Sequence, residues 1–364
     1  MMQLQRLRTS VAGRRRLSIP LRGRSASLSL ACVLLLGSPA GLALIGGEPD
    51  RDERYAAVVT ILSEAGSRKH CSATKIGPRR FLTAAHCVMD IDSGHLNPTH
   101  QRGGSLRISN AVSPKTLDDF IPVQVTETHV HPDFLAGLEE ARASRAERID
   151  RLEKKYEGAQ LVWHLSRLKE KHLLTTRVPD VAVIEVDQLT PSIATADLDL
   201  ESSLKDANVT LVGYGCQSIE EWNERSSRAS FGERRWADTR VLRVDFVNFH
   251  SSARRTRADG PSLCPGDSGG AVMYNGKLVG VHGAAFQPDA AGRPRSNMAV
   301  NLRELKRWVP LSEQRQNDAE SDSGGARPRL GALAGRAKMT AFRVKPLRSP
   351  IATLRTSTLF LNLC

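Results

Sequence analysis

The stretch Cys264-Pro265-Gly266-Asp267-Ser268-Gly269-Gly270 carries the strongest chemical signal in this sequence. It surrounds one serine with glycines and places an acid directly before it. A serine hydroxyl is a poor nucleophile unless a base takes its proton, and the base works best when an acid holds its tautomer. A serine in this setting therefore predicts a histidine and an acid elsewhere in the chain.

Two other strings supply those groups. Thr83-Ala84-Ala85-His86-Cys87 offers an imidazole beside a cysteine, and Pro179-Asp180-Val181-Ala182-Val183-Ile184 puts one acid immediately before an apolar, strand-like run. A lone histidine or serine is most often an ordinary polar residue. The joint presence of His86, Asp180 and Ser268, in that order, indicates nucleophilic catalysis by a serine.

Together the three strings resemble the motifs of the chymotrypsin-like (trypsin-like) serine peptidase family, in a bacterial-type secreted form, over about Leu44 to Pro310. The resemblance implies an all-β fold of two antiparallel six-stranded β-barrels with the active site between them. It implies His86 as general base, Asp180 as the acid that orients it and Ser268 as nucleophile. The backbone N–H groups of Gly266 and Ser268 would form the oxyanion hole.

The implied activity is that of an endopeptidase acting through an acyl-enzyme on a polypeptide substrate, with no cofactor and no metal. We expect a monomer. Four histidines that could suggest a metal site lack a compact ligand set, and we interpret them as loop residues: His95, His100, His129 and His131. The second function class is a protease-fold binding protein, in which a helical insertion or the tail engages a partner.

The cysteines predict two disulfides in an exported protein. Four cysteines lie in the compact region and allow three pairings, while Cys364 is left over at the end of the chain. The resemblance implies that Cys71 pairs with Cys87 and closes the loop carrying the base. The family's usual partner for Cys264 would lie downstream, where only Cys364 occurs, so we expect Cys264 to pair with Cys216.

The first residues of the predicted domain suggest how the protein would be activated by cleavage. Leu44-Ile45-Gly46-Gly47 resembles the family's mature N-terminus, where a new α-amine neutralises the acid before the nucleophile, here Asp267. No propeptide is recognisable, so cleavage after Ala43 by signal peptidase would form this N-terminus directly. The alternative is a glycine-rich turn that follows a cut after Ala40.

The residue at the base of the substrate pocket, by resemblance, lies six positions before the nucleophile and is Ser262. It is not an acid, so the usual partner of an Arg or Lys side chain is missing. The pocket walls by the same count are Gly283, Ala284 and Ala285, where relatives more often have Ser, Trp and Gly. We therefore expect basic side chains not to be preferred.

The N-terminal segment 1–43 has the layout of an export signal: an arginine-rich start, an apolar run over 26–36 and small residues up to Ala43. Cys32 would be removed with it. The run is too short for a comfortable anchor, and no internal stretch approaches the roughly 20 apolar residues of a bilayer span. We therefore expect a secreted or periplasmic protein without a stable membrane span.

The formal charge of +13 describes the two ends of the chain. Residues 1–30 carry seven arginines and no acid, and residues 311–364 carry nine basic and four acidic residues. This leaves 36 basic and 35 acidic residues for 31–310, which argues against a nucleic-acid partner.

Short β-branched runs between turn-forming residues predict strands. They lie at 57–62, 80–84, 121–126, 181–186, 208–212, 241–247, 270–273 and 278–281. The stretch 134–174 instead has helical spacing and predicts one long helix or a helical hairpin, inserted before Asp180 and bordering the cleft. Ala299 to Trp308 predicts a short C-terminal helix stopped by Pro310. Residues 311–364 predict a disordered basic tail, and the charged run Glu220 to Arg235 a solvated surface.

Overall fold

The computed structural model describes residues 44–62, 70–169, 178–216, 231–252, 261–286, 296–308 and 310–311. All of them fall within one unit, Gly41–Cys364. The predicted signal segment, residues 312–364 of the predicted tail and the unpaired Cys364 lie outside the described residues.

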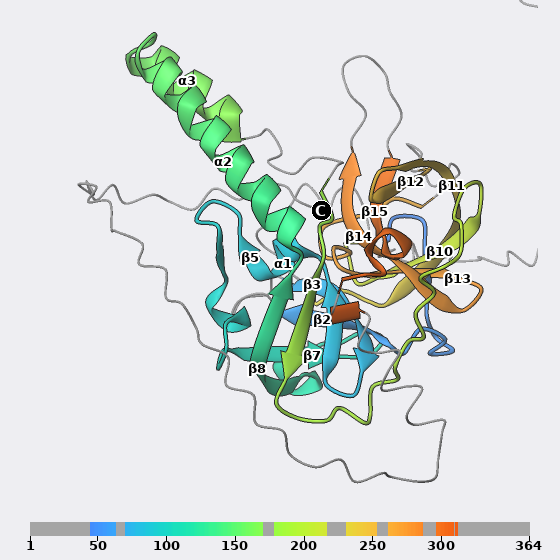
Figure 1. Ribbon diagram of the computed structural model, residues 1–364. Coiled ribbons are helices and arrows are strands. Elements are labelled where there is room, and N and C mark those ends of the chain that lie inside the picture. The colour runs from blue at the N-terminus through green and yellow to red at the C-terminus, as the bar shows by residue number, and fades with distance from the viewer. Residues whose placement is uncertain are drawn as a thin grey trace, which may run out of the picture. The chain divides into compact units, whose positions relative to one another are not determined.

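Six antiparallel strands close the first barrel in the order β2-β3-β4-β9-β8-β7 (Figure 1). Their bounds are Val58–Leu62 (β2), His70–Gly77 (β3), Arg80–Thr83 (β4), Ser105–Ser109 (β7), Ile121–Val130 (β8) and Ala182–Val186 (β9). Apolar side chains from these strands, including Ile61, Leu82 and Ile108, are fully buried in one cluster. Burial of this apolar surface is the main force that holds the barrel closed.

The second barrel closes in the order β11-β10-β13-β14-β15-β12, because β12 also pairs with β11. Its strands are Asn208–Gly213 (β10), Arg235–Asp245 (β11), Asn248–Ser252 (β12), Ala271–Tyr274 (β13), Lys277–Phe286 (β14) and Ser296–Asn301 (β15). The short β1, Glu48–Pro49, adds to the outer edge of β11. The predicted fold class of two six-stranded antiparallel barrels is confirmed.

Short elements connect the strands of the first barrel. They are α1 (Ala85–Val88), β5 (Met89–Asp90), β6 (His95–Leu96) and the 3-10 helices Pro98–His100 and Leu117–Asp119. The segment from β4 to α1 carries His86, so the first barrel supplies one of the predicted triad residues directly after a buried strand.

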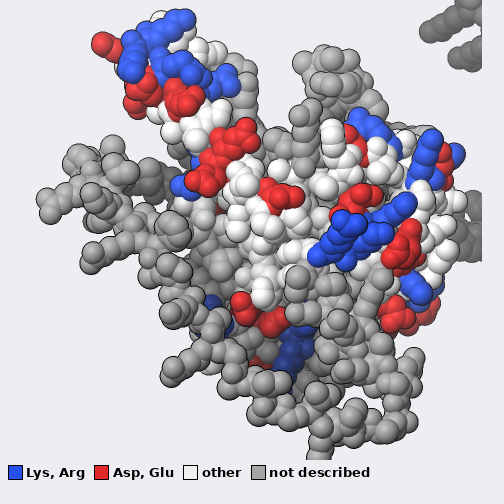
Figure 2. Space-filling view, viewed as in Figure 1, with Lys and Arg blue, Asp and Glu red and all other residues white. Residues whose placement is uncertain are grey.

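The insertion before Asp180 is a helical hairpin, which decides between the two predicted forms. Helix α2 spans Pro132–Glu153 and α3 spans Gly158–Lys169. Phe134 and Leu138 bury the first turns of α2 in the core of the first barrel, and the rest of the hairpin extends away from it (Figure 1). Lys, Arg, Asp and Glu side chains are mixed along its outer part (Figure 2), as expected for a solvated surface.

No helix among the described residues is both long and apolar enough to cross a bilayer.

The C-terminal helix predicted over Ala299 to Trp308 is wrong in its bounds. Ala299 and Val300 end β15, where they pair with β12 on one side and β14 on the other. Only Leu302–Leu305 is helical, as a 3-10 turn. The apolar residues of this segment fit the spacing of a strand as well as that of a helix. Pairing with two neighbouring strands makes Ala299 and Val300 a strand. Leu311, assigned to the tail from the sequence, is fully buried in a core cluster that includes residues of both barrels.

The prediction of a solvated charged run fails at Arg234 and Arg235, which are 0% and 2% exposed; residues 220–230 lie outside the described residues. The guanidinium of Arg234 donates to Asp50 Oδ2 (2.8 Å) and to the Asn110 carbonyl (2.7 Å). Asp50 also accepts the backbone N–H groups of Arg54 and Tyr55. Buried charges persist where they are paired in this way.

Candidate active site

His86 and Asp180 are in direct contact. His86 lies in α1 and Asp180 directly precedes Val181 and β9. The distance from His86 Nδ1 to Asp180 Oδ2 is 2.6 Å, and the backbone N–H of His86 donates to Asp180 Oδ1 at 2.9 Å. Both side chains are more than nine-tenths buried. An ionised carboxylate only accepts hydrogen bonds, so this contact puts the imidazole proton on Nδ1 and leaves Nε2 as a base.

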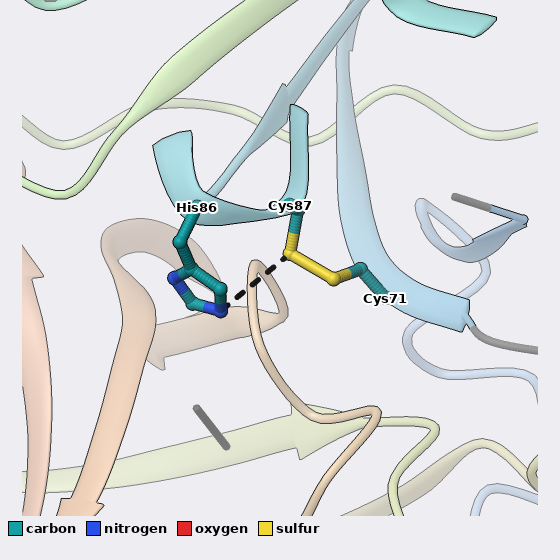
Figure 3. A group of neighbouring side chains, drawn as sticks. All are labelled: Cys71, His86 and Cys87. Atoms are coloured by element: carbon teal, nitrogen blue, oxygen red, sulfur yellow. Dashed lines mark hydrogen bonds between the residues drawn. A yellow bond between two sulfur atoms is a disulfide. The ribbon is translucent and has the colours of Figure 1, made fainter. Parts of the chain in front are cut away.

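The disulfide Cys71–Cys87 anchors the base from the other side (Figure 3). His86 Nε2 lies 3.9 Å from Cys87 Sγ. Cys87 Sγ in turn lies 3.7 Å from the carbonyl oxygen of Ser268. Helix α1, which carries His86, and the turn that carries Ser268 therefore meet at this disulfide.

Ser268 is 2% exposed, and among the described residues its hydroxyl has no hydrogen-bond partner. The turn around it is held by its backbone: Gly269 N–H donates to the His282 carbonyl and Gly270 N–H to the Asp267 carbonyl. The structure thus places the three predicted triad residues around one region, with a direct bond between His86 and Asp180.

The two predicted oxyanion donors lie on the same turn. Within the described ranges, neither the Gly266 N–H nor the Ser268 N–H donates to a protein acceptor. Gly266 has φ of +101°, a conformation that favours glycine, and a Cβ there would lie 2.5 Å from His70 Nε2. The second disulfide, Cys216–Cys264, joins the start of this turn to the segment after β10. Both disulfides are the pairs expected from the sequence.

Asp267 is completely buried. Its two carboxylate oxygens accept the N–H groups of Gly215 (2.7 Å) and Cys264 (2.9 Å). Burial raises the pKa of Asp267 to about 7, and these two hydrogen bonds oppose that rise. Side chains at Gly213 or Gly215 would overlap the carboxylate, which explains both glycines of the Gly-Tyr-Gly turn.

Leu44, the other member of the predicted activation pair, is fully buried beside Leu263 in the core of the second barrel. In the uncut chain no hydrogen bond joins Leu44 to Asp267 among the described residues. Ile45 forms an antiparallel bridge with Ser262, whose N–H donates to the Ile45 carbonyl at 2.9 Å. The N-terminal segment therefore lies against the predicted pocket base.

The predicted pocket residues lie on two segments. Ser262 is 1% exposed and its hydroxyl donates to the Leu263 carbonyl at 3.2 Å. Gly283, Ala284 and Ala285 lie in β14, with a register shift between His282 and Ala284. A Cβ at Gly283 would lie 3.6 Å from Asp180 Oδ2. Gly283 thus lies beside Asp180, the predicted triad acid, a position that the count of residues did not reveal.

The prediction that the four histidines are loop residues is wrong for His95, His100 and His129, whereas His131 does lie in the connection between β8 and α2. His95 and His129 lie in strands β6 and β8, His100 in a buried 3-10 turn, and His131 caps α2 by accepting the Asp133 N–H. Burial lowers the pKa of His100 to about 4.

His129 also lies near carboxylates that the sequence did not bring together. Its ring and the carboxylates of Glu127 and Glu185 have ligand atoms within 4.8 Å of one another. Arg80 and Arg102 pair with the same two carboxylates, so their charge is balanced without a metal ion. His95 and His129 line a cavity of about 950 Å³ outside the first barrel, which no triad residue lines.

Sequence reasoning missed several residues that support the turn around Ser268. Ser72 and His70, in β3, contact that turn or the Gly-Tyr-Gly segment beside it. His282, in β14, accepts the Gly269 N–H through its carbonyl and is fully buried, and burial lowers its pKa to about 3. None of them belongs to a recognisable string. The position of Ser72 directly after Cys71 was the one available signal.

Two closed antiparallel barrels that meet at a His-Asp pair and a glycine-flanked serine define the chymotrypsin-like class of folds. Residues 125–309, slightly more than half of the chain, match the family model described as Trypsin. The chain belongs to the trypsin family of serine peptidases. The matched range includes Asp180 and Ser268 and begins after His86.

Several solved structures are similar to this chain. Neuropsin, a serine protease expressed in the limbic system of mouse brain, is 15% identical over 73% of this chain and 98% of its own, with a TM-score of 0.45. Human heparin binding protein is 16% identical over 78% and 100%, with a TM-score of 0.45. Glu endopeptidase is 17% identical over 77% and 99%, with a TM-score of 0.46. No curated protein matches the sequence.

Proposed function

We propose that this protein is an exported serine endopeptidase. The observation that carries the proposal is the buried contact of 2.6 Å between His86 Nδ1 and Asp180 Oδ2, next to the turn that holds Ser268, whose hydroxyl has no partner within the described part of the chain. A structural histidine has no need of a buried carboxylate on one nitrogen and an adjacent serine loop on its other side.

The proposed reaction follows from these groups. His86 Nε2 takes the proton of Ser268 Oγ as this oxygen attacks the carbonyl carbon of the scissile bond. The negative oxygen of the tetrahedral intermediate accepts the N–H groups of Gly266 and Ser268. The imidazolium then gives its proton to the leaving amine, and an acyl-enzyme forms on Ser268. Water, activated by His86, hydrolyses that ester and regenerates the serine.

A fluorophosphonate probe tests the proposal directly, because it reacts only with an activated serine. We expect the protein beginning at Leu44 to be labelled on Ser268, as located by peptide mapping, and Ser268→Ala to remain unlabelled. Ser109→Ala is the matched control, since Ser109 is also buried, 1% exposed, and lies in β7, outside the predicted triad and pocket residues. Failure of the unaltered protein to react, at any pH between 6 and 9, would reject the endopeptidase proposal.

The same experiment bears on the second function class. Val162 and Trp163 on α3 are 67% and 54% exposed, and such side chains favour a role of the hairpin in binding a partner protein. A folded protein that neither reacts with the probe nor cleaves any peptide would favour this binding function.

The predicted pocket also implies a preference for certain substrate side chains before the scissile bond. An Arg or Lys side chain would bring its charge into a desolvated pocket where Ser262 offers only neutral dipoles, a penalty on the order of a few kcal/mol. We therefore propose a preference for medium-sized apolar residues before the scissile bond, and expect basic residues to be cleaved at least about tenfold more slowly.

The measurement is kcat/KM over a peptide library varied at that position. A clear preference for Arg or Lys would overturn the expectation and would implicate an acid from outside Ser262, with Asp259 and Asp289 the first candidates for substitution.

The compartment and the chain's processing belong to the same proposal. Two disulfides favour an oxidising environment. We propose that residues 1–43 direct export and are removed, that 44–310 form the peptidase domain with its insertion at 134–174, that the tail 311–364 is dispensable for hydrolysis, and that the mature protein is a monomer.

A further inference from the structure

We propose that Ser72 is a positioning residue that fixes both residues carrying the oxyanion donors; this inference rests on the proposed function. Ser72 lies in β3 of the first barrel and is fully buried. Its backbone N–H donates to the carbonyl oxygen of Ser268 at 2.8 Å, and its hydroxyl donates to the carbonyl oxygen of Gly266 at 2.8 Å. One residue of the first barrel therefore holds both ends of the Gly266–Ser268 turn.

The surroundings of Ser72 determine where its hydroxyl proton points. The backbone N–H of Tyr214 donates to Ser72 Oγ at 3.0 Å, so the oxygen acts as acceptor on that side. The carbonyl of Gly266 can only accept, and it takes the single hydroxyl proton. Tyr214 is itself held, because its carbonyl lies 2.8 Å from His70 Nε2 and its phenolic hydroxyl donates to the Ala111 carbonyl.

The backbone of Ser72 is also fixed. The hydroxyl of Thr83, in β4, donates to the Ser72 carbonyl at 2.8 Å, and Thr83 is fully buried as well. Gly269 packs so closely here that a Cβ on it would overlap both Thr83 Oγ1 and the Ser72 carbonyl oxygen. Ser72 therefore has no room to follow the turn if the turn moves.

The two hydrogen bonds from Ser72 matter because Gly266 is the residue of the turn with the greatest backbone freedom. A glycine loses the most conformational freedom on ordering, and its φ of +101° is set by its neighbours rather than by a side chain. The Gly266 carbonyl and the Asp267 N–H share one peptide plane, which is held by the Ser72 hydroxyl and by the hydrogen bond from the Asp267 N–H to the Cys264 carbonyl at 2.9 Å. Without the Ser72 hydroxyl this plane loses one of its two anchors, so Gly266, and with it the direction of its N–H in the preceding peptide plane, is held less firmly. Donors for a developing oxyanion are effective only when they are held in place beforehand.

The test is Ser72→Ala in the protein that begins at Leu44. We expect kcat to fall roughly 10- to 100-fold with little change in KM, somewhat less than the loss of a whole oxyanion donor. The affinity for a peptide aldehyde, whose adduct with Ser268 carries an oxyanion, should fall by a similar factor. Ser72→Thr keeps the hydroxyl and should recover most of both.

Thr60→Val is the matched control. Thr60 faces Ser72 across β2 and β3 and is fully buried, and among the described residues its hydroxyl has no hydrogen-bond partner. Its kcat and aldehyde affinity should equal those of the unaltered protein. If Ser72→Ala does not fold, Ser72→Cys replaces it, with a weaker donor and an intermediate loss expected.

The outcomes separate this inference from the proposed function. If the unaltered protein cleaves peptides while Ser72→Ala, or Ser72→Cys in its place, keeps full kcat and aldehyde affinity, the positioning role is refuted. A lower melting temperature with unchanged kcat and aldehyde affinity also refutes it, because the hydroxyl would then serve stability alone. An unaltered protein that does not react with the fluorophosphonate probe contradicts the proposed function instead.

Discussion

Ser268→Ala, His86→Ala and Asp180→Asn should each lower kcat by about three orders of magnitude or more, with little change in folding. Ser268→Ala removes the nucleophile, and His86→Ala removes the base. Asp180→Asn keeps the size of the side chain but replaces an acceptor at His86 Nδ1 by a group that can also donate, which favours the wrong tautomer.

The double variants provide the decisive comparison. Because the three groups act as one unit, the double variants should add little to the loss of Ser268→Ala alone. Kinetics with a peptide ester and an amide, combined with melting temperatures for each variant, measure this. Normal turnover by Ser268→Ala would exclude the triad, and losses that multiply would show that the groups act separately.

Blocking the α-amine of Leu44 should leave a folded protein with at least about 100-fold lower kcat/KM. In the uncut chain Asp267 is buried, and among the described residues two backbone N–H groups stabilise its charge, while burial raises its pKa to about 7. A free amine that reaches Asp267 would keep it ionised and fix the turn that carries both oxyanion donors. Adding one alanine before Leu44 removes that possibility.

The free energy of unfolding as a function of pH tests the pairing of the Leu44 α-amine with Asp267 without relying on activity. A carboxyl group whose folded pKa lies above its unfolded value of 3.8 binds more protons in the folded state between the two values. The form with the extra alanine should therefore lose stability as pH rises from about 4 to about 7, by an amount on the order of a few kcal/mol.

The form that begins at Leu44 should not show this loss, because the amine supports the ionised carboxylate. Asp267→Asn with the extra alanine is the control, and its stability should be flat in this range. Full activity of the extended form, or an active secreted protein that begins at Gly41, would contradict the activation proposal.

The fold class and the position of the candidate site could be predicted because the relevant side chains lie in short, local strings. The motif around Ser268 and the alternating apolar residues of strands such as 181–186 depend on neighbours in sequence, and the structure has them where they were expected. The four cysteines alone allow three pairings, and the resemblance to the family implied the two pairs that the structure has.

The features that could not be predicted depend on partners far away in the chain. In the sequence, Arg234 belongs to a charged run that predicts a solvated surface. In the structure it is buried because it pairs with Asp50, 184 residues earlier. Ala299 and Val300 form a strand because they pair with β12 on one side and with β14 on the other. The hydroxyl of Ser72 donates a hydrogen bond to the carbonyl of Gly266, which lies 194 residues later in the chain. No local pattern encodes such contacts.

The attachment of the N-terminal segment has a consequence for timing. Ile45 bridges to Ser262, β1 pairs with β11, and Asp50 binds Arg234, so every one of these contacts waits for residues between 234 and 262. While a ribosome or a translocation channel still holds those residues, these contacts cannot cover the bond before Leu44. A processing enzyme that acts during synthesis or transport meets an extended strand, whereas one that arrives after folding meets a leucine that is already fully buried.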